Sequence, residues 1–270
     1  MRPGSGAAAP SMLFGFPISP ASREELARAI IRDAPRLGGG VRLVVTMNLD
    51  HVVRLQKDPA FRAAYRRAWV ITADGAPIQF YGRLRGARTR RCAGSDLLID
   101  LAQAFSPDRH RLFFVVSTPA TGERLKARFE AAGFTDGFAF ASPPFGFEKD
   151  AAQSAALCEA IRRHRTTHLI MGLGAPKSEV WIDRHRAALG DIYACAFGSA
   201  PDFLVGTARR APEGLRRIGL EWAWRVAQDP RRLWRRYFID AWAFLPAVAR
   251  DLLARQANEP VGPSQPELPQ

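Results

Sequence analysis

The stretch ITADGAPIQF, residues 71–80, joins a strand pattern to a helix pattern. Its first residues complete an apolar run, and the pair Asp74-Gly75 follows. A helix is predicted to begin near Ala76 with Pro77 in its first turn, where proline is tolerated because the first helical N–H groups have no internal partner. Asp74 is therefore predicted on a tight turn at the carboxyl end of a strand. There it could be a turn former, a helix cap or a catalytic carboxylate.

The alternation of strand and helix continues on both sides of this stretch. Short apolar runs predict buried strands at 41–46, 69–72, 112–117, 168–173 and 192–197. Helical patterns lie between them, near 22–32, 49–67, 95–105, 121–132, 151–164 and 178–188. Continuous apolar strands separated by helices predict an α/β fold, a mainly parallel sheet with helices on both faces.

Polar clusters follow several of these strands. In parallel sheets ligands bind outside the carboxyl ends of the strands. The clusters at 46–48, 74–75, 117–118 and 172–177 are therefore predicted to converge on one ligand site.

Composition indicates a globular protein with anionic partners. The 270 residues, 47% of them hydrophobic, suffice for one large α/β domain or for a domain with an appendage. A net charge of +13 favours phosphates, nucleic acid or an acidic membrane surface as partners. Cys92, Cys158 and Cys195 are far apart, and we interpret each as a buried apolar side chain in a reducing cytoplasm. We expect neither a signal peptide nor a membrane-spanning stretch of ~20 apolar residues.

The character of the chain changes after about residue 210. Arginines alternate there with tryptophans and other aromatic residues, which predicts amphipathic helices, and the last residues are rich in proline. The predicted organisation is a catalytic α/β domain over 1–212, a helical appendage over 213–256 and a disordered tail over 257–270.

Two motifs also have ordinary structural explanations. GLGAPKSEVW (172–181) is typical of a phosphate cradle between a strand and a helix, with Lys177 adding charge, but it equally fits a plain glycine-rich turn. In AGSDLLIDL (93–101), Ser95 fits a helix cap. The five histidines lack metal-ligand spacing, so we expect no metal site.

Four blocks occur in order along the chain: VVTMNLDHVVRLQKDPAFRAAYRRAWVITADGAPIQF (44–80), RCAGSDLL (91–98), LIMGLGAPKSEVWI (169–182) and RRAPEGLRRIGLEWAWRVAQDPRRLWRRY (209–237). Together they resemble the WecG/TagA/CpsF glycosyltransferase family over roughly residues 40–240. The last block is the most specific, because Gly-Leu-Glu-Trp is followed by a Pro-Arg-Arg-x-Trp-Arg-Arg-Tyr run.

The resemblance implies a Rossmann-like fold with a C-terminal helical appendage that associates with the membrane. It implies an inverting, metal-independent and cofactor-free transfer of a hexose-type sugar from a UDP-sugar to a polyprenyl-diphosphate-linked sugar. The enzyme would be cytoplasmic and peripheral on the inner face of the cell membrane, and its products would feed cell-wall polymers, capsules or exopolysaccharides. The implied partners are the donor, the lipid-linked acceptor and an anionic membrane surface. A homo-oligomer is left open.

The resemblance also assigns residues. Asp74 falls on the family's proposed base, which takes the proton of the acceptor hydroxyl. Thr46 and Asn48 match a Thr-x-Asn motif implied to bind the donor sugar or to orient Asp74. Asp202 is assigned to the uridine. The whole implied substrate-binding set is Gly94, Ser95, Asp96, Gly172, Gly174, Lys177, Ser178, Glu179 and Asp202.

Three arginines at the start of the appendage match family arginines: Arg210, Arg217 and Arg225. A planar guanidinium pairs two oxygens of a diphosphate, so at least one is expected to be catalytic at the UDP leaving group. Each alone could instead be a solvated charge or a lipid-headgroup contact.

The chain departs from the family at two places. Ser178 replaces the usual glutamine, and a hydroxyl has a shorter reach than an amide. Ser117-Thr118 replaces a Gly-Gly pair, which puts close backbone approach to the nucleotide in doubt there, although hydroxyls could serve a diphosphate. The identity of the donor sugar therefore cannot be inferred from relatives.

Two other functions fit the residues in part. A nucleotide-cofactor oxidoreductase suits the parallel sheet, but GxGxxG and its ribose-binding acid are missing from the sequence. A nucleic-acid-binding protein suits the high pI of about 10.8 and the Arg/aromatic mixture. Binding of NAD(P) but not UDP would favour the first, and salt-sensitive binding of RNA or DNA the second. Because the Arg/Trp pattern is concentrated at one end of the chain, it favours a membrane surface, and we prefer the transferase.

Overall fold

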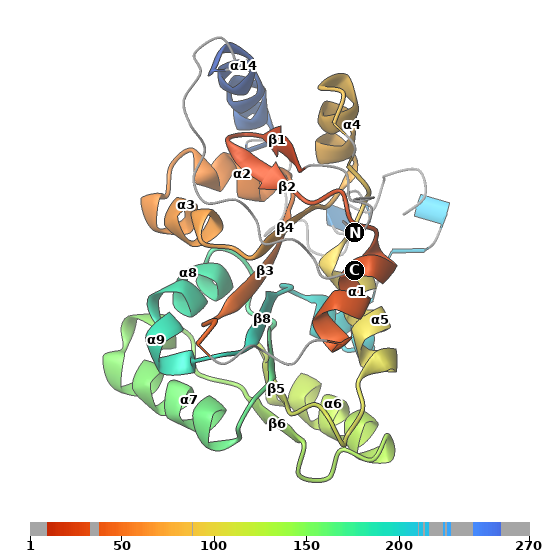
Figure 1. Ribbon diagram of the computed structural model, residues 1–270, viewed down its shortest axis with the longest axis vertical. Helices are drawn as coiled ribbons and strands as arrows, with labels where there is room; N and C mark the ends of the chain where they lie inside the picture. Colours follow the sequence, from red (N-terminus) through yellow and green to blue (C-terminus); the bar gives the residue numbers. More distant parts are fainter. Residues whose placement is uncertain are drawn as a thin grey trace, which may run out of the picture.

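The computed structural model describes residues 10–32, 38–87, 89–209, 211–212, 214–215, 224, 226–227 and 240–254. At its centre is a six-stranded sheet in the order β4-β3-β8-β7-β5-β6, in which all neighbouring strands are parallel. Its strands are β3 (Arg42–Met47), β4 (Val70–Ala73), β5 (Leu112–Val115), β6 (Phe138–Ala141), β7 (His168–Met171) and β8 (Tyr193–Ala196). The predicted α/β fold with a parallel sheet is confirmed (Figure 1).

Five of these strands were predicted, and β6 was missed. Its sequence FAFA mixes alanine with phenylalanine, and only Phe138 is buried, whereas β4 at the other edge of the sheet is buried throughout. FAFA is apolar but contains none of the β-branched residues that occur in the five predicted strands.

Helices cover both faces of the sheet. One face carries α2 (Leu49–Leu55), α3 (Pro59–Arg66), α7 (Ala151–Arg163), α8 (Lys177–Arg184) and α9 (Arg186–Leu189). The other face carries α1 (Arg23–Arg32), α5 (Gly94–Ala104), α6 (Pro119–Ala131) and α10 (Ala200–Leu204). The 3-10 turn η1 (Phe147–Lys149) precedes α7. Consecutive residues of β3 alternate between the two cores: Leu43 and Val45 pack on the α2 side, and Val44 on the α1 side.

The segment 49–67 was predicted as one helix but forms two. Asp58 accepts a hydrogen bond from the N–H of Phe61 at 3.0 Å and so caps α3, with Pro59 in its first turn. A residue before proline is disfavoured in helical geometry, which explains the break between α2 and α3.

The sheet reverses its winding between β5 and β7. From β5 the chain runs through α6 to the edge strand β6, whereas from β7 it runs through α8 and α9 in the opposite direction to β8. In such sheets the ligand crevice lies beside the carboxyl ends of the two strands at the reversal. Here the segments that follow those ends are 116–118 and 172–176.

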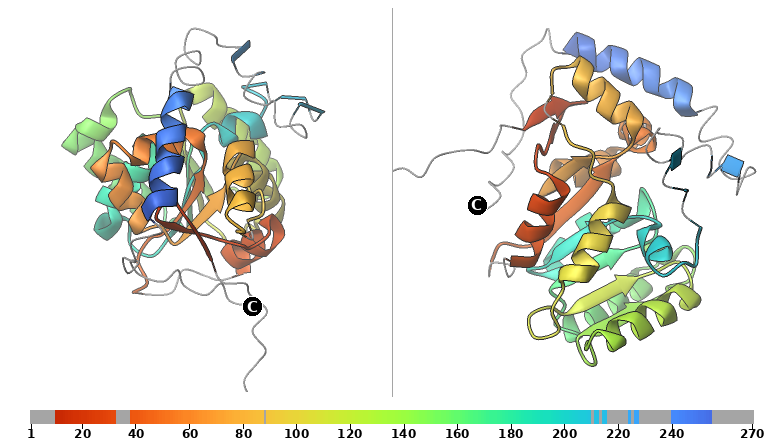
Figure 2. Two further views of the ribbon diagram at one scale, coloured as in Figure 1. Left: turned by 90° about the horizontal axis from the view of Figure 1, so that it is seen from above. Right: turned by 90° about the vertical axis from the view of Figure 1, so that its right-hand side faces the viewer.

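A further group of elements lies beyond the carboxyl ends of β3 and β4. It comprises the hairpin β1 (Ser11–Leu13) and β2 (Phe16–Ile18), with α4 (Ala76–Leu84), η3 (Asp240–Ala243) and α14 (Phe244–Ala254). Figure 2 shows α14 beside α4 at this end of the molecule. In the described part of the chain, every helix is too short or too polar to cross a bilayer.

Candidate active site

Asp74 lies at the carboxyl end of β4, directly beside the end of β3. Met47 pairs with Ala73 in the parallel register, and the N–H of Asp74 then donates to the carbonyl oxygen of Met47 at 2.7 Å. The pairing of the two strands thus continues one residue past β4. This bond positions the Asp74 backbone against Asn48, the residue that follows Met47.

The cap position of α4 belongs to Gly75, not to Asp74. Gly75 has φ +87° and precedes a helix with Pro77 in its first turn, so the predicted helix start is confirmed. A positive φ of this kind favours glycine. The turn therefore depends on Gly75, and α4 does not require the Asp74 carboxylate as its cap.

Thr46 and Asn48 sit at the end of the neighbouring strand, as predicted. Thr46 is 5% exposed and lies opposite Thr72 in the register. The side-chain oxygen of Asn48 accepts the N–H of His51 at 3.1 Å and caps α2. The hydrogen bond to His51 uses the amide oxygen of Asn48, and this bond holds the side chain in place. The NH₂ group of Asn48 takes no part in the cap.

A buried polar cluster links Asp74 to α8. The hydroxyl of Tyr65 lies 2.6 Å from Nδ1 of His51. Burial raises the pKa of Tyr65 well above its ordinary value, and the charges of Glu179, Asp74 and Asp50 raise it further. Three carboxyl groups, from α8, from the end of β4 and from the first turn of α2, therefore act on one phenol. We did not single out Tyr65 or His51 from the sequence, because their pairing depends on how α2 packs on α3.

Ser178 and Glu179, in the first turn of α8, are both buried. Ser178 is fully buried and Glu179 is 2% exposed. Burial raises the pKa of Glu179 to about 7. Among the residues that the structure describes, Oγ of Ser178 and Oε2 of Glu179 lack a hydrogen-bond partner. Buried polar atoms are usually paired, so these two are candidate ligand contacts.

The glycines before α8 have a packing role in addition to any role in ligand binding. A Cβ on Gly172 would lie 2.9 Å from Cγ of Pro201 and 3.2 Å from the carbonyl oxygen of Val115, so only glycine fits. Gly174 has φ +78°. Lys177 lies 3.8 Å from a carboxylate oxygen of Glu148, and its ammonium lies over the Phe145 ring, 4.1 Å from the centroid.

Asp202 belongs to a network of hydroxyl groups beside the sheet reversal. The hydroxyl of Thr121 donates to Oδ1 of Asp202 at 2.7 Å and lies 2.9 Å from the hydroxyl of Thr207. Thr118 caps α6 by accepting the N–H of Thr121 at 3.3 Å. The Thr118 hydroxyl therefore already has a structural task, which weakens the expectation that it serves a diphosphate.

Gly94, Ser95 and Asp96 open α5 on the other face of the sheet. The N-cap is Ala93, so the expectation that Ser95 caps this helix is wrong: Ser95 lies inside the first turn. A Cβ on Gly94 would come 3.0 Å from the Phe197 ring, so the glycine permits close packing.

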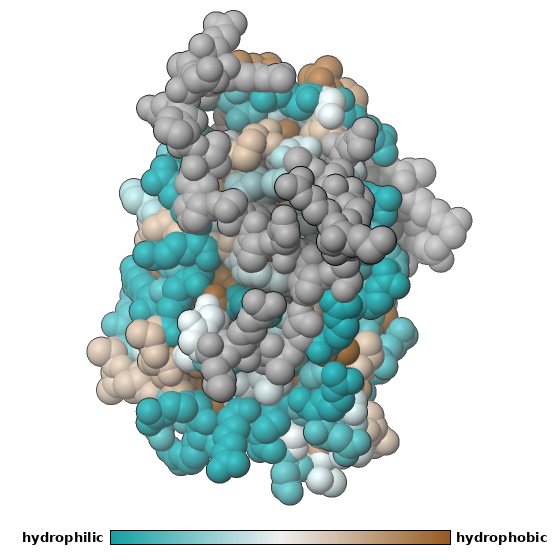
Figure 3. All heavy atoms as spheres, viewed as in Figure 1, coloured by the Kyte–Doolittle hydropathy of each residue, from teal (hydrophilic) through white to brown (hydrophobic). Residues whose placement is uncertain are grey.

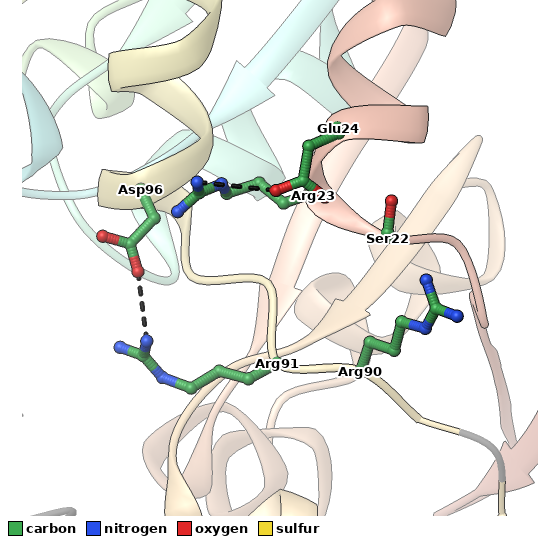
Figure 4. Close-up of a pocket in the computed structure, with 6 residues that line it drawn as sticks. All are labelled: Ser22, Arg23, Glu24, Arg90, Arg91 and Asp96. Atoms are coloured by element: carbon green, nitrogen blue, oxygen red, sulfur yellow. Dashed lines mark hydrogen bonds and ion pairs between the residues drawn. The ribbon is translucent and has the colours of Figure 1, made fainter. Parts of the chain in front are cut away.

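Asp96 lines a cavity of about 310 Å³ at the start of α5. The cavity is bounded by residues from the starts of α1 and α5 and from the segment before α5: Ser22, Arg23, Glu24, Arg90, Arg91 and Asp96 (Figure 4). Nη1 of Arg91 lies 3.1 Å from Oδ2 of Asp96, so the Asp96 carboxylate is already neutralised. Arg91 forms an isolated parallel β-bridge with Ala73, the last residue of β4, so the cavity lies along this edge strand.

The structure thus brings Thr46, Asn48, Asp74 and Glu179 into one neighbourhood. Lys177 and Asp202 lie near the sheet reversal, Lys177 on the α8 face and Asp202, like Asp96, in a helix of the opposite face. The predicted catalytic arginines Arg210, Arg217 and Arg225 fall outside the described residues.

Comparison with known proteins identifies a family and a relative of this chain. The model of the glycosyl transferase WecG/TagA/CpsF family matches residues 11–258. The chain is also 28% identical over 201 residues to the N-acetylglucosaminyldiphosphoundecaprenol N-acetyl-beta-D-mannosaminyltransferase of Bacillus spizizenii. That match covers 72% of this chain and 73% of the relative.

Proposed function

Because the chain belongs to the glycosyl transferase WecG/TagA/CpsF family, we propose that it is an inverting transferase that moves a hexose-type sugar from a UDP-sugar to a polyprenyl-diphosphate-linked sugar. The name of the Bacillus relative supports the acceptor class, since it describes transfer to an N-acetylglucosaminyl diphosphate carried by undecaprenol. The observation that carries the proposal is the position of Asp74, held by Met47 at the carboxyl end of the sheet beside Asn48.

Asp74 acts as the general base. Its carboxylate takes the proton of the acceptor hydroxyl while that oxygen attacks the anomeric carbon of the donor. The new C–O bond forms on the face opposite the bond to UDP, which breaks, so the anomeric configuration inverts. UDP leaves with the electron pair, and the proton remains on Asp74. A base on a strand-end turn is held rigidly, which favours a reactive geometry.

The donor lies along the carboxyl ends of β3, β8 and β7, between Asp74 and the sheet reversal. Thr46 and the amide nitrogen of Asn48 bind the donor sugar or orient Asp74. Oγ of Ser178 and Oε2 of Glu179, the buried oxygens without a partner among the described residues, also contact the donor. Asp202 faces the uridine, with its carboxylate oriented by Thr121.

Positive charge from the protein stabilises the UDP leaving group. Lys177 is 32% exposed at the start of α8, where free backbone N–H groups add to the field. Arg210, Arg217 and Arg225 complete this charge, and at least one of them contacts the diphosphate.

The reaction takes place at the inner face of the cell membrane, where the enzyme is peripheral and supplies cell-surface polysaccharide synthesis. A lipid-linked acceptor keeps its polyprenyl tail in the bilayer, so the enzyme must work at the membrane surface. The net charge of +13 suits anionic lipid headgroups.

The test is a donor screen with defined acceptors. UDP-sugars, among them UDP-N-acetylmannosamine, are incubated with a short-chain polyprenyl-diphosphate N-acetylglucosamine, and products are read by mass spectrometry. We expect one or a few donors to extend the acceptor by a single sugar. If no UDP-sugar is transferred and the protein binds NAD(P) instead, the proposal is wrong.

A further inference from the structure

Large apolar side chains are exposed on two helices that lie side by side at one end of the molecule. Of the seven large hydrophobic residues that are exposed in the described part of the chain, six are on α4, η3 or α14, and the seventh is Phe145. We call these six the apolar end surface: Phe80 (72% exposed), Leu84 (67%), Trp242 (71%), Leu245 (57%), Leu252 (45%) and Leu253 (66%). Figure 3 shows hydrophobic residues at the upper end of the molecule, where Figure 1 places α14 and α4.

The two helices are joined through their inward faces. The hydroxyl of Tyr81 on α4 donates to Oδ2 of Asp251 on α14 at 2.6 Å, and Nη1 of Arg85 lies 2.7 Å from the same oxygen. Phe14 packs between them, with its ring centroid 4.8 Å from that of Tyr81 and 5.7 Å from that of Phe244. These contacts hold the two helices together, so their outward faces form one surface.

The charge on this surface suits an anionic partner. The sequences of α4, η3 and α14 contain two acidic residues, Asp240 and Asp251, and Asp251 is engaged inward with Arg85. Arg83 and Arg250 are both exposed. An apolar face rimmed by cations is the arrangement with which amphipathic helices enter the boundary between headgroups and acyl chains of anionic bilayers.

The apolar end surface lies at the same end of the molecule as the candidate base. Helix α4 begins two residues after Asp74. Helix α14 contacts α2, which begins directly after Asn48. A bilayer against this surface would therefore face the end of the sheet at which the acceptor sugar must arrive.

We propose that α4 and α14 together form the surface that docks on an anionic lipid bilayer. The sequence assigned membrane attachment to the segment 213–256 alone; α4 belongs to the α/β domain and follows the candidate base directly. The choice of a bilayer as occupant rests on the proposed lipid-linked acceptor. Phe80 and Leu84 enter the bilayer beside the side chains of α14, so the catalytic domain itself is held on the membrane with Asp74 near the headgroups.

Co-sedimentation with vesicles tests this without any turnover. The full chain is mixed with vesicles of phosphatidylglycerol and phosphatidylethanolamine, in four forms: wild type, Phe80→Gln/Leu84→Gln, Leu245→Gln/Leu252→Gln, and the exchange variant Phe80→Leu/Leu84→Phe. Glutamine is a good helix former, and all four positions are exposed, so the fold should persist. Each glutamine pair should weaken binding roughly tenfold or more, because the apolar area that enters the bilayer is lost. The exchange variant should bind like wild type.

A water-soluble acceptor separates docking from catalysis. The α4 glutamine variant should keep its turnover on a short-chain soluble acceptor and lose it on a long-chain acceptor in vesicles. Unchanged vesicle binding by this variant would overturn the role of α4, whatever the donor screen shows. The proposal would also be overturned if wild type forms a dimer in lipid-free solution that the same variant dissociates, because the surface would then bind a second copy.

Discussion

The backbone N–H of Asp74 donates to the carbonyl oxygen of Met47 at 2.7 Å, one residue beyond the last registered pair of β3 and β4. This bond extends a parallel ladder into the turn that carries the candidate base. Gly75 supplies the positive φ that the turn requires and occupies the N-cap position of α4, so Asp74 precedes the cap. Four predictions follow from the environment of this turn and of the helices beside it.

Asp74→Asn should abolish turnover and leave the fold and UDP binding intact. Asparagine has nearly the same shape and keeps the backbone bond to Met47, but it cannot accept a proton. The rate of transfer should fall ~10²–10⁴-fold. Steady-state kinetics with a soluble acceptor, alongside calorimetric UDP binding, measure both effects. Asp136→Asn, an exposed change at the amino end of β6, serves as control. Near-normal turnover by a folded Asp74→Asn protein would refute the assignment.

Ser178→Ala should raise the donor KM severalfold with little change in stability. The Ser178 hydroxyl is fully buried and unpaired among the described residues, so its removal breaks no hydrogen bond within them. Loss of an unpaired buried hydroxyl is expected to be neutral or slightly stabilising. Donor KM and urea unfolding should be measured on the same preparation. If the unfolding free energy stays constant and the KM for every UDP-sugar is also unchanged, Ser178 does not contact the donor.

Glu179→Gln should remove a pH dependence of stability. Burial raises the pKa of Glu179 from its ordinary value of 4.5 to about 7, so the folded state favours the neutral acid. Its contribution to stability is fully present below about pH 4.5 and is lost as pH rises to about 7. Between pH 4.5 and pH 7 the unfolding free energy of wild type should therefore fall relative to that of Glu179→Gln, by up to roughly 3 kcal/mol.

Urea unfolding at several pH values measures this difference for Glu179. Glu159→Gln, a change at a half-exposed position of α7 that removes only surface ion pairs to Arg162 and Arg163, is the control and should follow wild type. A difference between wild type and Glu179→Gln that stays constant from pH 4.5 to pH 8 would show that Glu179 keeps an ordinary pKa.

Asp251→Asn should loosen α14 from α4. The side chains of Arg85 and Asp251 are each 11% exposed, so the variant leaves a nearly buried guanidinium without its counter-charge. Breaking one partner of such a pair costs roughly 3 kcal/mol. Hydrogen exchange of the amides in 244–254 should accelerate, and Tm should fall. Arg250→Gln, which loses only a 3.3 Å bond to the Gln56 side chain, should change neither. If the amides in 244–254 exchange equally fast in both variants, the ion pair between Asp251 and Arg85 does not hold α14 on α4.

Local pattern was enough to locate the strands and the turn that bears Asp74. Apolar runs that end in polar residues determine both features, because a strand buried on two faces must be continuously apolar and a parallel strand must end in a loop. The same logic placed Thr46 and Asn48 beside Asp74 before the strand order was known. The pattern failed at β6, which has no β-branched residue, and at Ser95, where the helix begins two residues earlier than a serine cap at this position requires.

Contacts between distant segments were decided only by tertiary packing. Glu179 and Asp74 are far apart in the chain, yet both act on the Tyr65 phenol, because α8 packs on α3. Asp251 meets Tyr81 across 170 positions of sequence, and that pairing turns two exposed helix faces into one surface. The sequence by itself determined which residues lie on strands, turns and apolar helix faces, since backbone periodicity is local. Which of them meet, and which carboxyl group is buried deeply enough to change its pKa, depends on the three-dimensional packing that removes water from them.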